Sequence, residues 1–290
     1  GGAAEVRYNE TRMPAKKTKD YQKLALAAHR KLRGKLEVKS KAALKTKDDW
    51  STLYTPGVGA VAAHVAKKPE DARQYTVTRN SVAVVSDGSA VLGLGNIGAV
   101  GALPVMEGKC VIFKEMAGVD AWPIVLATQD VDEVVDTVTR IAPGFGGINL
   151  EDIAAPRCFA IEARLKEKLS IPVLHDDQHG TAVVVVAGLL NAAKVVEKKF
   201  EKLRVVIVGA GAAGTAIAYL LLHAGVREVV VADSNGLLVE GRNALPPYKK
   251  ELAAYTNPRR ISGEVLQVAD GADVLIGVSG PGTLTKHHIE

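Results

Sequence analysis

Two pairs of neighbouring acidic residues each follow an apolar segment typical of a buried strand. Glu151 and Asp152 come after GGINL, and Asp176 and Asp177 come after IPVLH. Carboxylates gathered at strand ends supply the hard oxygen ligands that Mg²⁺ and Mn²⁺ prefer. Adjacent acids are also common where loops begin and helices are capped. The spacing alone therefore leaves both interpretations open.

Other residues near these acids are also candidates for chemistry. His175 and His179 flank the second acidic pair, and two imidazoles four residues apart on a helix would suggest zinc. Because Gly180 follows, the segment is expected to be a loop, which favours solvated or structural histidines. Lys109, expected just before a buried strand, is either a desolvated base or a lysine facing solvent. Tyr54, in a rigid loop, is either an acid or a packed aromatic.

The segment GAGAAG, residues 209–214, has the glycine pattern of a dinucleotide-binding turn. It follows an apolar strand and opens an apolar helix, and Asp233 ends the next strand. Gly209 permits the tight turn, Gly211 lets the backbone approach a pyrophosphate, and Gly214 allows close packing of helix on sheet. Asp233 is expected to bind ribose hydroxyls and to repel a 2′-phosphate. This favours NAD, with NADP as the alternative cofactor.

These residues need a scaffold, and the apolar patterning predicts alternating strands and helices. Strands are expected at 81–88, 110–113 and 124–127, in GGINLEDI and IPVLHDD, and in LRVVIV, EVVVAD and ADVLIGV; helices are expected at 19–34, 130–143, 158–168, 181–199 and in AIAYLLLHAG. Such alternation favours parallel sheets. We predict an α/β protein with a catalytic, metal-binding domain at 1–195, which begins with a helical region. Residues 196–290 are predicted to form an NAD(P)-binding domain with a Rossmann-type parallel sheet that is incomplete at its C-terminus.

Composition excludes several classes of protein. Of the 290 residues, 47% are hydrophobic and 24% are charged, as in globular proteins. Aromatic residues make up only 4%, and the net charge of +5 is not concentrated in a late basic block, so nucleic-acid binding is not expected. Two cysteines, no signal-peptide pattern at residues 1–17 and no apolar run long enough to span a bilayer predict a cytoplasmic protein without membrane contact.

Six segments together resemble the malic enzymes in their shorter microbial form. They are YTPGVG, VAVVSDGSAVLGLGNIG, ALPVMEGK, GGINLEDI, HDDQHGTA and the GAGAAG unit, and they occur in the family's order. The resemblance extends from about Tyr21 to Glu290. Ala90 stands where larger members of the family carry an arginine, and the family continues beyond the position of Glu290.

The resemblance implies oxidative decarboxylation of L-malate to pyruvate and CO₂ with reduction of NAD or NADP. It implies that Glu151, Asp152 and Asp177 bind Mg²⁺ or Mn²⁺. Lys109 would be the general base, oriented by Asp176, and Tyr54 would be the general acid. Cofactor contacts would come from the following residues: Thr181, Gly209, Ala210, Gly211, Ala212, Ala213, Gly214 and Asp233.

The resemblance also implies a homodimer or a larger homo-oligomer. Two other hypotheses stay open. One is a two-domain amino-acid or hydroxy-acid dehydrogenase that does not decarboxylate its substrate, and the other is a catalytically silent NAD-binding module. Metal dependence separates the malic enzyme hypothesis from the first, and NAD binding without turnover would identify the second.

Overall fold

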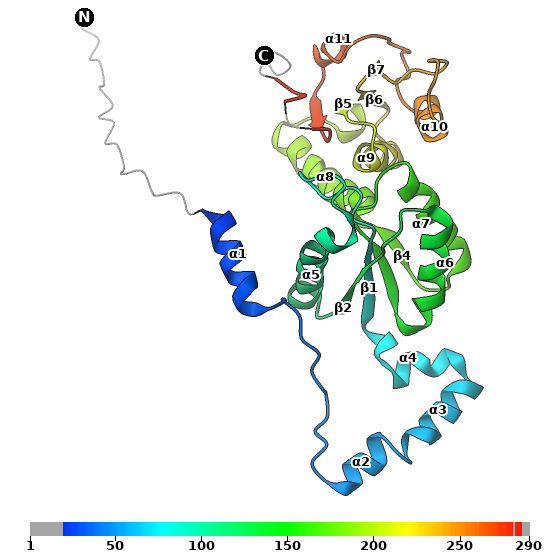
Figure 1. Cartoon of the computed structure of the whole chain (residues 1–290). Coiled ribbons are helices and arrows are strands. Elements are labelled where there is room, and N and C mark those ends of the chain that lie inside the picture. Colours follow the sequence, from blue (N-terminus) through cyan, green and yellow to red (C-terminus); the bar gives the residue numbers. More distant parts are fainter. Residues whose placement is uncertain (1–19, 281, 286–290) are drawn as a thin grey trace, which may run out of the picture. The chain divides into compact units, whose positions relative to one another are not determined.

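The computed structural model describes residues 20–280 and 282–285 (Figure 1). The chain divides into two units, residues 1–37 and 38–290, which are described separately. In the first unit, α1 (Tyr21–Leu32) begins where the Asp20 side chain accepts a hydrogen bond from the N–H of Lys23. It ends at Arg33, which has a left-handed φ of 57°. The expected N-terminal helix is confirmed, whereas residues 1–17 lie outside the described part of the chain.

The second unit alternates strands and helices as the apolar patterning predicts. Its helices are α2 (Lys47–Leu53), α3 (Val58–Lys67), α4 (Ala72–Tyr75), α5 (Gly98–Ala117), α6 (Val131–Ile141), α7 (Arg157–Lys168), α8 (Asp176–Val195), α9 (Ala212–His223), α10 (Pro247–Tyr255) and α11 (Leu266–Ala269). Its strands are β1 (Ser81–Ser86), β2 (Asp120–Val125), β3 (Gly147–Leu150), β4 (Val173–His175), β5 (Arg204–Val208), β6 (Glu228–Asp233), β7 (Gly236–Leu237) and β8 (Val274–Gly277). Short 3-10 helices lie at Pro69–Asp71, Val77–Arg79, Ala142–Gly144 and Phe200–Lys202.

The first sheet is parallel, with strand order β2-β1-β3-β4. Side chains alternate between its faces, as in any strand. Ala83 and Val85 of β1 pack in a core with α6 and α7, while Val84 packs with Met106 and Cys110 of α5. Helices therefore cover both faces, and only the strand ends remain for polar side chains.

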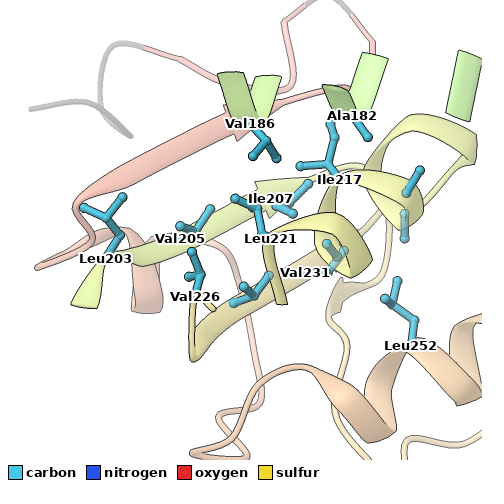
Figure 2. Close-up of a cluster of buried hydrophobic side chains, with 14 of the residues drawn as sticks. Ala182, Val186, Leu203, Val205, Ile207, Ile217, Leu221, Val226, Val231 and Leu252 are labelled. Atoms are coloured by element: carbon cyan, nitrogen blue, oxygen red, sulfur yellow. The ribbon is translucent and has the colours of Figure 1, made fainter. Parts of the chain in front are cut away.

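The second sheet has strand order β7-β6-β5-β8, in which β5, β6 and β8 are parallel and β7 runs antiparallel to β6. Figure 2 shows the core on one of its faces, where Ala182 and Val186 of α8 pack against Ile207 and Ile217. Thus α8 begins at the end of β4 in the first sheet and packs along the second. This helix therefore carries the acids in its first turn and also packs against the sheet that bears the glycine-rich turn.

The structure corrects three expectations. Segment 110–113 is not a strand but part of α5, and β2 begins earlier than expected, at Asp120. A short apolar run cannot be distinguished from a buried helix segment by periodicity alone. The segment from Asp176 to Thr181 is not a loop but the start of α8. The second sheet is α/β and Rossmann-like, but β7 makes it mixed rather than fully parallel.

Both cysteines, Cys110 and Cys158, are buried and free. In the part of the chain that the structure describes, no helix combines the length and the apolar character needed to cross a membrane.

Candidate active site

Three carboxylates meet at the carboxyl-terminal edge of the first sheet. Glu151 and Asp152 follow β3 directly, and Asp177 lies in the first turn of α8, just after β4. One ligand atom from each residue lies within 4.8 Å of those from the other two, and Glu151 and Asp152 are buried. Because β3 and β4 are parallel neighbours, their ends lie at the same edge. The fold therefore brings together the three acids that were expected to bind a metal ion.

Backbone hydrogen bonds hold this acidic cluster in place. Asp152 has a left-handed φ of 54°, a conformation that aspartate adopts more readily than most residues. Its N–H donates to Oδ2 of Asp177 over 2.9 Å, and its carbonyl accepts from the N–H of Ala90 over 2.9 Å. The turn after β3, the start of α8 and the loop after β1 are thus tied together at one residue.

The protonation of the cluster reflects its burial. Desolvation raises the pKa of Glu151 to about 7, although Asn149 hydrogen-bonds to it and Lys109 is nearby. Desolvation and the charge of Asp177 raise the pKa of Asp152 to about 6. Oδ2 of Asp152 is buried and accepts no hydrogen bond from any described residue. Crowded carboxylates with a free oxygen fit a hard divalent cation, which supplies the opposing charge.

Lys109 extends from α5 to this cluster. Its Nζ lies 2.6 Å from Oδ2 of Asp176 and 3.1 Å from Oε1 of Glu151, and its side chain is 23% exposed. Burial disfavours the ammonium, but the hydrogen bond to Asp176 and the charge of Glu151 raise the pKa of Lys109 overall. The ammonium form of Lys109 is therefore favoured in this site. It reaches the site from a helix interior and not from a strand start, because segment 110–113 is helical.

Two further residues of α8 bear on the site. A Cβ at Gly180 would lie 2.3 Å from Oδ1 of Asp176, so glycine leaves room for this carboxylate in its present position. Thr181 lies one helical turn after Asp177 and is half-buried. Its position on the helix that joins the two sheets is compatible with a cofactor contact.

Tyr54 lies apart from these interactions. It follows α2 as its C-terminal cap and precedes the cis Thr55–Pro56 peptide bond. The side chain is 63% exposed, and within the described residues its hydroxyl makes no hydrogen bond. The structure does not join Tyr54 to the acidic cluster.

The glycine-rich turn lies between β5 and α9, at the carboxyl end of β5. Gly209 has a φ of 126°, and a Cβ on Gly214 would lie 1.7 Å from the carbonyl oxygen of Gly209. These two positions require glycine for the turn itself. A Cβ on Gly211 would meet no atom within 4 Å, so the backbone there borders open space. That space, at the amino-terminal end of α9, suits a pyrophosphate, which the helix N–H groups stabilise.

Asp233 ends β6 beside this turn, but its carboxylate is already paired. Oδ2 accepts hydrogen bonds from Arg242 over 2.6 Å and Lys249 over 2.7 Å, and Oδ1 accepts from the N–H of Asn235 over 2.9 Å. Burial opposes ionisation, but these hydrogen bonds lower the pKa of Asp233 to about 2. Arg242 and Lys249 had not been singled out from the sequence, since each lies in a separate segment after the acid.

Sequence reasoning also missed Asp87 and Arg157. Asp87 is buried just after β1, and its Oδ2 accepts a hydrogen bond from Arg157 of α7 over 2.9 Å. Its Oδ1 accepts from the N–H and hydroxyl of Ser89, and the Ser89 Oγ accepts from the N–H of Ala154. This network ties the loop after β1 to the segment carrying Asp152. The rule that located the other acids, an acid directly after a buried strand, would have found Asp87.

One of the two histidines is buried, and the other is partly exposed but paired with a carboxylate. His175 is fully buried at the end of β4, and Nε2 of His179 lies 2.8 Å from Oε1 of Glu162. Among the described residues, the group identified by ligand distances contains Glu151, Asp152 and Asp177 and neither histidine. The arrangement favours the interpretation that both histidines are structural.

Comparisons with known proteins identify the family. Residues 33–166 match the model described as "Malic enzyme, N-terminal domain", and residues 178–290 match "Malic enzyme, NAD binding domain". The crystal structure of the NAD-dependent malic enzyme from Thermotoga maritima superposes with a TM-score of 0.88 at 50% identity, covering 91% of this chain and 71% of that one. The chain belongs to the malic enzyme family.

Two further malic enzymes, both longer than this chain, are similar to it in sequence. The NAD-dependent malic enzyme of Geobacillus stearothermophilus is 57% identical over 89% of this chain and 54% of its own length. The bifunctional malic/malolactic enzyme of Bacillus subtilis (strain 168) is 53% identical over 92% of this chain and 65% of its own length. The chain thus spans about half to two thirds of the length of these malic enzymes.

The two malic enzyme models divide the candidate residues between them. Tyr54, Lys109, Glu151 and Asp152 lie within the N-terminal match, whereas Thr181, the GAGAAG turn and Asp233 lie within the NAD-binding match. Asp176 and Asp177 lie between the two matches, at the start of α8. The candidate residues therefore come from both matches and from the segment between them.

Proposed function

We propose that this chain carries out the metal-dependent oxidative decarboxylation of L-malate to pyruvate and CO₂, with reduction of NAD or NADP. The observation that carries the proposal is the acidic cluster with Lys109 at its edge, built partly from the helix that packs along the dinucleotide-binding sheet. The nicotinamide cofactor is supported by the family's NAD-binding model.

In this proposal Glu151, Asp152 and Asp177 hold Mg²⁺ or Mn²⁺. When bound, the cation acts as a Lewis acid toward the substrate oxygens, and its charge opposes protonation of the nearby Lys109. The proposed donor set is supported by three observations: all ligand atoms are carboxylate oxygens, they lie within 4.8 Å of one another, and one of them has no hydrogen-bond donor among the described residues.

Lys109 is proposed to remove the proton from the C2 hydroxyl of malate. A bound nicotinamide cofactor would supply the acceptor for the hydride from C2. Asp176, 2.6 Å from Nζ, holds the amine in position and gives the proton a neighbouring acceptor. After CO₂ departs from the β-keto acid, Tyr54 is proposed to protonate C3 of the resulting enolate to give pyruvate. Lys109 is supported by its contacts with Asp176 and Glu151; Tyr54 rests on the family resemblance alone.

We further propose that Asp233, paired with Arg242 and Lys249, governs the choice between NAD and NADP, with NAD preferred. The anionic carboxylate keeps both cations engaged and disfavours a 2′-phosphate. Replacing Asp233 with alanine should weaken NAD binding more than NADP binding, shifting the ratio of their dissociation constants by about tenfold or more. Titration of each dinucleotide against the variant measures this ratio.

The control for this substitution is Asp233→Asn, which keeps the side-chain shape and removes the charge. It should shift the ratio in the same direction, since both variants free the two cations. If Asp233→Ala weakens NADP more than NAD, this role for Asp233 is wrong.

We infer two domains: residues 1–195, which carry the metal-binding site, and residues 196–290, which carry the glycine-rich cofactor turn.

We also infer a homodimer or a larger homo-oligomer, because large apolar side chains of α2 and α3, among them Trp50, Leu53 and Val58, are exposed. A mass by light scattering of about twice 30.6 kDa or more is expected, and a monomer would contradict this inference. The two buried free thiols are compatible with a cytoplasmic location.

The decisive test is an assay of nicotinamide reduction by the 290-residue chain with L-malate. NAD is compared with NADP and Mn²⁺ with EDTA, and pyruvate is measured in parallel. We expect metal-dependent reduction with matching pyruvate. Reduction without pyruvate would favour a non-decarboxylating dehydrogenase. NAD binding by a folded chain without reduction would favour a silent binding module.

A further inference from the structure

A buried polar network lies next to Asp177. It consists of Glu162 of α7, His175 at the end of β4 and Gln178 of α8, and all three are buried. None of them belongs to the acidic cluster, yet His175 and Gln178 both lie within two residues of Asp177 in the chain. Hydrogen bonds within a buried polar network fix the orientation of its members more strictly than apolar packing does.

Glu162 is the anchor of this network. It accepts hydrogen bonds from the backbone N–H of His175 over 3.1 Å and from Nε2 of His179, and Nζ of Lys166 lies 2.9 Å from its Oε1. Burial disfavours its charge, but these donors lower the pKa of Glu162 to about 2. Glu162 is therefore a carboxylate, which accepts hydrogen bonds and donates none.

The carboxylate determines how the amide of Gln178 is oriented. One terminal atom of Gln178 lies 3.3 Å from Oε2 of Glu162 and 3.1 Å from Nδ1 of His175. An atom facing a carboxylate at this distance must be the amide nitrogen, because two acceptors would repel each other. The nitrogen has two hydrogens, one for Glu162 and one for the imidazole. Nδ1 of His175 is therefore an acceptor.

An acceptor at Nδ1 requires the neutral imidazole to carry its hydrogen on Nε2. This Nε2 is fully buried and lies 3.2 Å from Oδ2 of Asp177. The two atoms are close enough for a hydrogen bond but are not aligned as one, and no other described residue accepts from Nε2. A buried N–H without an acceptor is unfavourable, so completing the bond to Asp177 is favoured.

Oδ2 of Asp177 also accepts the N–H of Asp152 over 2.9 Å. Both donors thus approach the same oxygen. Within the described part of the chain, Oδ1 of Asp177 accepts no hydrogen bond, which leaves it available to a cation.

We propose that Glu162, Gln178 and His175 form a positioning relay, in which Glu162 orients Gln178, Gln178 fixes the Nε2–H tautomer of His175, and His175 holds Asp177 for the divalent cation. This inference rests on the proposed metal site. A network that only packs α7 against α8 would have no effect on the tautomer or on metal affinity beyond its effect on stability.

The test compares Gln178→Met with the wild-type chain. Methionine has a similar length but removes both hydrogens, so His175 loses the constraint on its tautomer. We expect the dissociation constant for Mn²⁺, from the free-ion signal in electron paramagnetic resonance, to rise about 10- to 100-fold. The control Lys166→Met removes a half-exposed partner of Glu162 and should leave Mn²⁺ affinity unchanged, because Gln178 stays oriented.

A second pair of variants examines the donor itself. His175→Gln retains an N–H at the end of the side chain and should bind Mn²⁺ nearly as well as the wild type, whereas His175→Leu should not. Nitrogen-15 NMR of histidine-labelled wild-type chain at alkaline pH reports the tautomer directly, with no need for a variant to fold. We expect the Nε2–H form at His175.

Three results would overturn the relay. An Nδ1–H tautomer in the wild type, unchanged Mn²⁺ affinity in folded Gln178→Met, or equal affinities of the two His175 variants would each do so while leaving the proposed metal site intact. Failure of the wild-type chain to bind Mn²⁺ at all would instead remove the metal site, and the relay with it.

Discussion

Replacing Asp177 with asparagine should remove most of the metal-dependent turnover of malate, by about 100-fold or more, while leaving NAD binding nearly intact. Asparagine has almost the same shape but supplies one charged oxygen ligand fewer to a cluster of three. The dinucleotide turn after β5 belongs to the other sheet and is not altered by the substitution. Steady-state kinetics at varied Mn²⁺ and a separate titration of NAD measure the two effects.

The matched control for this substitution is Asp136→Asn. Asp136 forms an exposed ion pair with Arg140 on α6, away from the acidic cluster, and its loss should change neither turnover nor Mn²⁺ affinity. Unchanged turnover of Asp177→Asn at saturating Mn²⁺ would contradict the assignment of Asp177 as a ligand. If NAD binding is lost as well, the substitution has damaged the fold. The Mn²⁺ affinity of a refolded sample then decides whether Asp177 is a ligand.

The sequence predicts the α/β architecture and most of its elements because the apolar periodicity and the residues that cap helices indicate the same boundaries. Asp130, for example, caps α6 at the start of the expected helix, with its side chain accepting from the N–H groups of Asp132 and Glu133. The apolar run after Lys109 shows where local patterning fails. Buried helix and buried strand have the same composition there, and only packing against β1 and β2 decides for α5.

The candidate site was predictable to the extent that it depends on strand ends. Parallel strands place their carboxyl ends at one edge, so Glu151 and Asp177 could be expected to meet. Contacts that depend on side chains from distant helices could not be expected. Lys109 reaches Glu151 from α5, and Arg242 reaches Asp233 from a loop after β7. The spacing of these residues in the sequence does not predict either contact, because each contact depends on how a helix or a loop packs.

Gly180 shows how a single residue can mislead. Glycine after His179 favoured a loop, since glycine weakens a helix interior by about 1 kcal/mol relative to alanine. The structure places it inside α8, where a Cβ would collide with the Asp176 carboxylate. The local rule therefore failed here, and glycine at this position leaves room for the Asp176 carboxylate beside Lys109.

The second large effect concerns pH and stability. In the metal-free chain the pKa of Glu151 is raised from 4.5 to about 7, and that of Asp152 from 3.8 to about 6, by burial and by neighbouring carboxylates. The folded chain therefore binds more protons than the unfolded chain between about pH 4 and about pH 7. Stability must fall as pH rises through this window. Glu162 opposes this trend only at the acidic end of the window, because its pKa is lowered from 4.5 to about 2 and its contribution to stability is lost as pH falls below about 4.5.

A divalent cation should reverse the trend, because it replaces the protons as the positive partner of the cluster. At about 100 times its dissociation constant, Mn²⁺ should raise the Tm by roughly 5–10 °C at about pH 7.5. At about pH 5 the carboxyls are protonated and compete with the metal, so the rise should be about 1 °C. Thermal unfolding with and without Mn²⁺ at both pH values measures this difference.

The variant Asp152→Asn tests whether the pH dependence of the Tm comes from the acidic cluster and not from other titrating groups. Its metal-free Tm should depend less steeply on pH between about pH 4 and about pH 7, since one of the two raised carboxyls is gone. Mn²⁺ should also stabilise this variant less at about pH 7.5. Two results would contradict this prediction: equal Mn²⁺ effects on the wild-type Tm at the two pH values, or a metal-free Tm that rises from about pH 4 to about pH 7. Either would mean that these acids do not have raised pKa values and do not bind the cation as proposed.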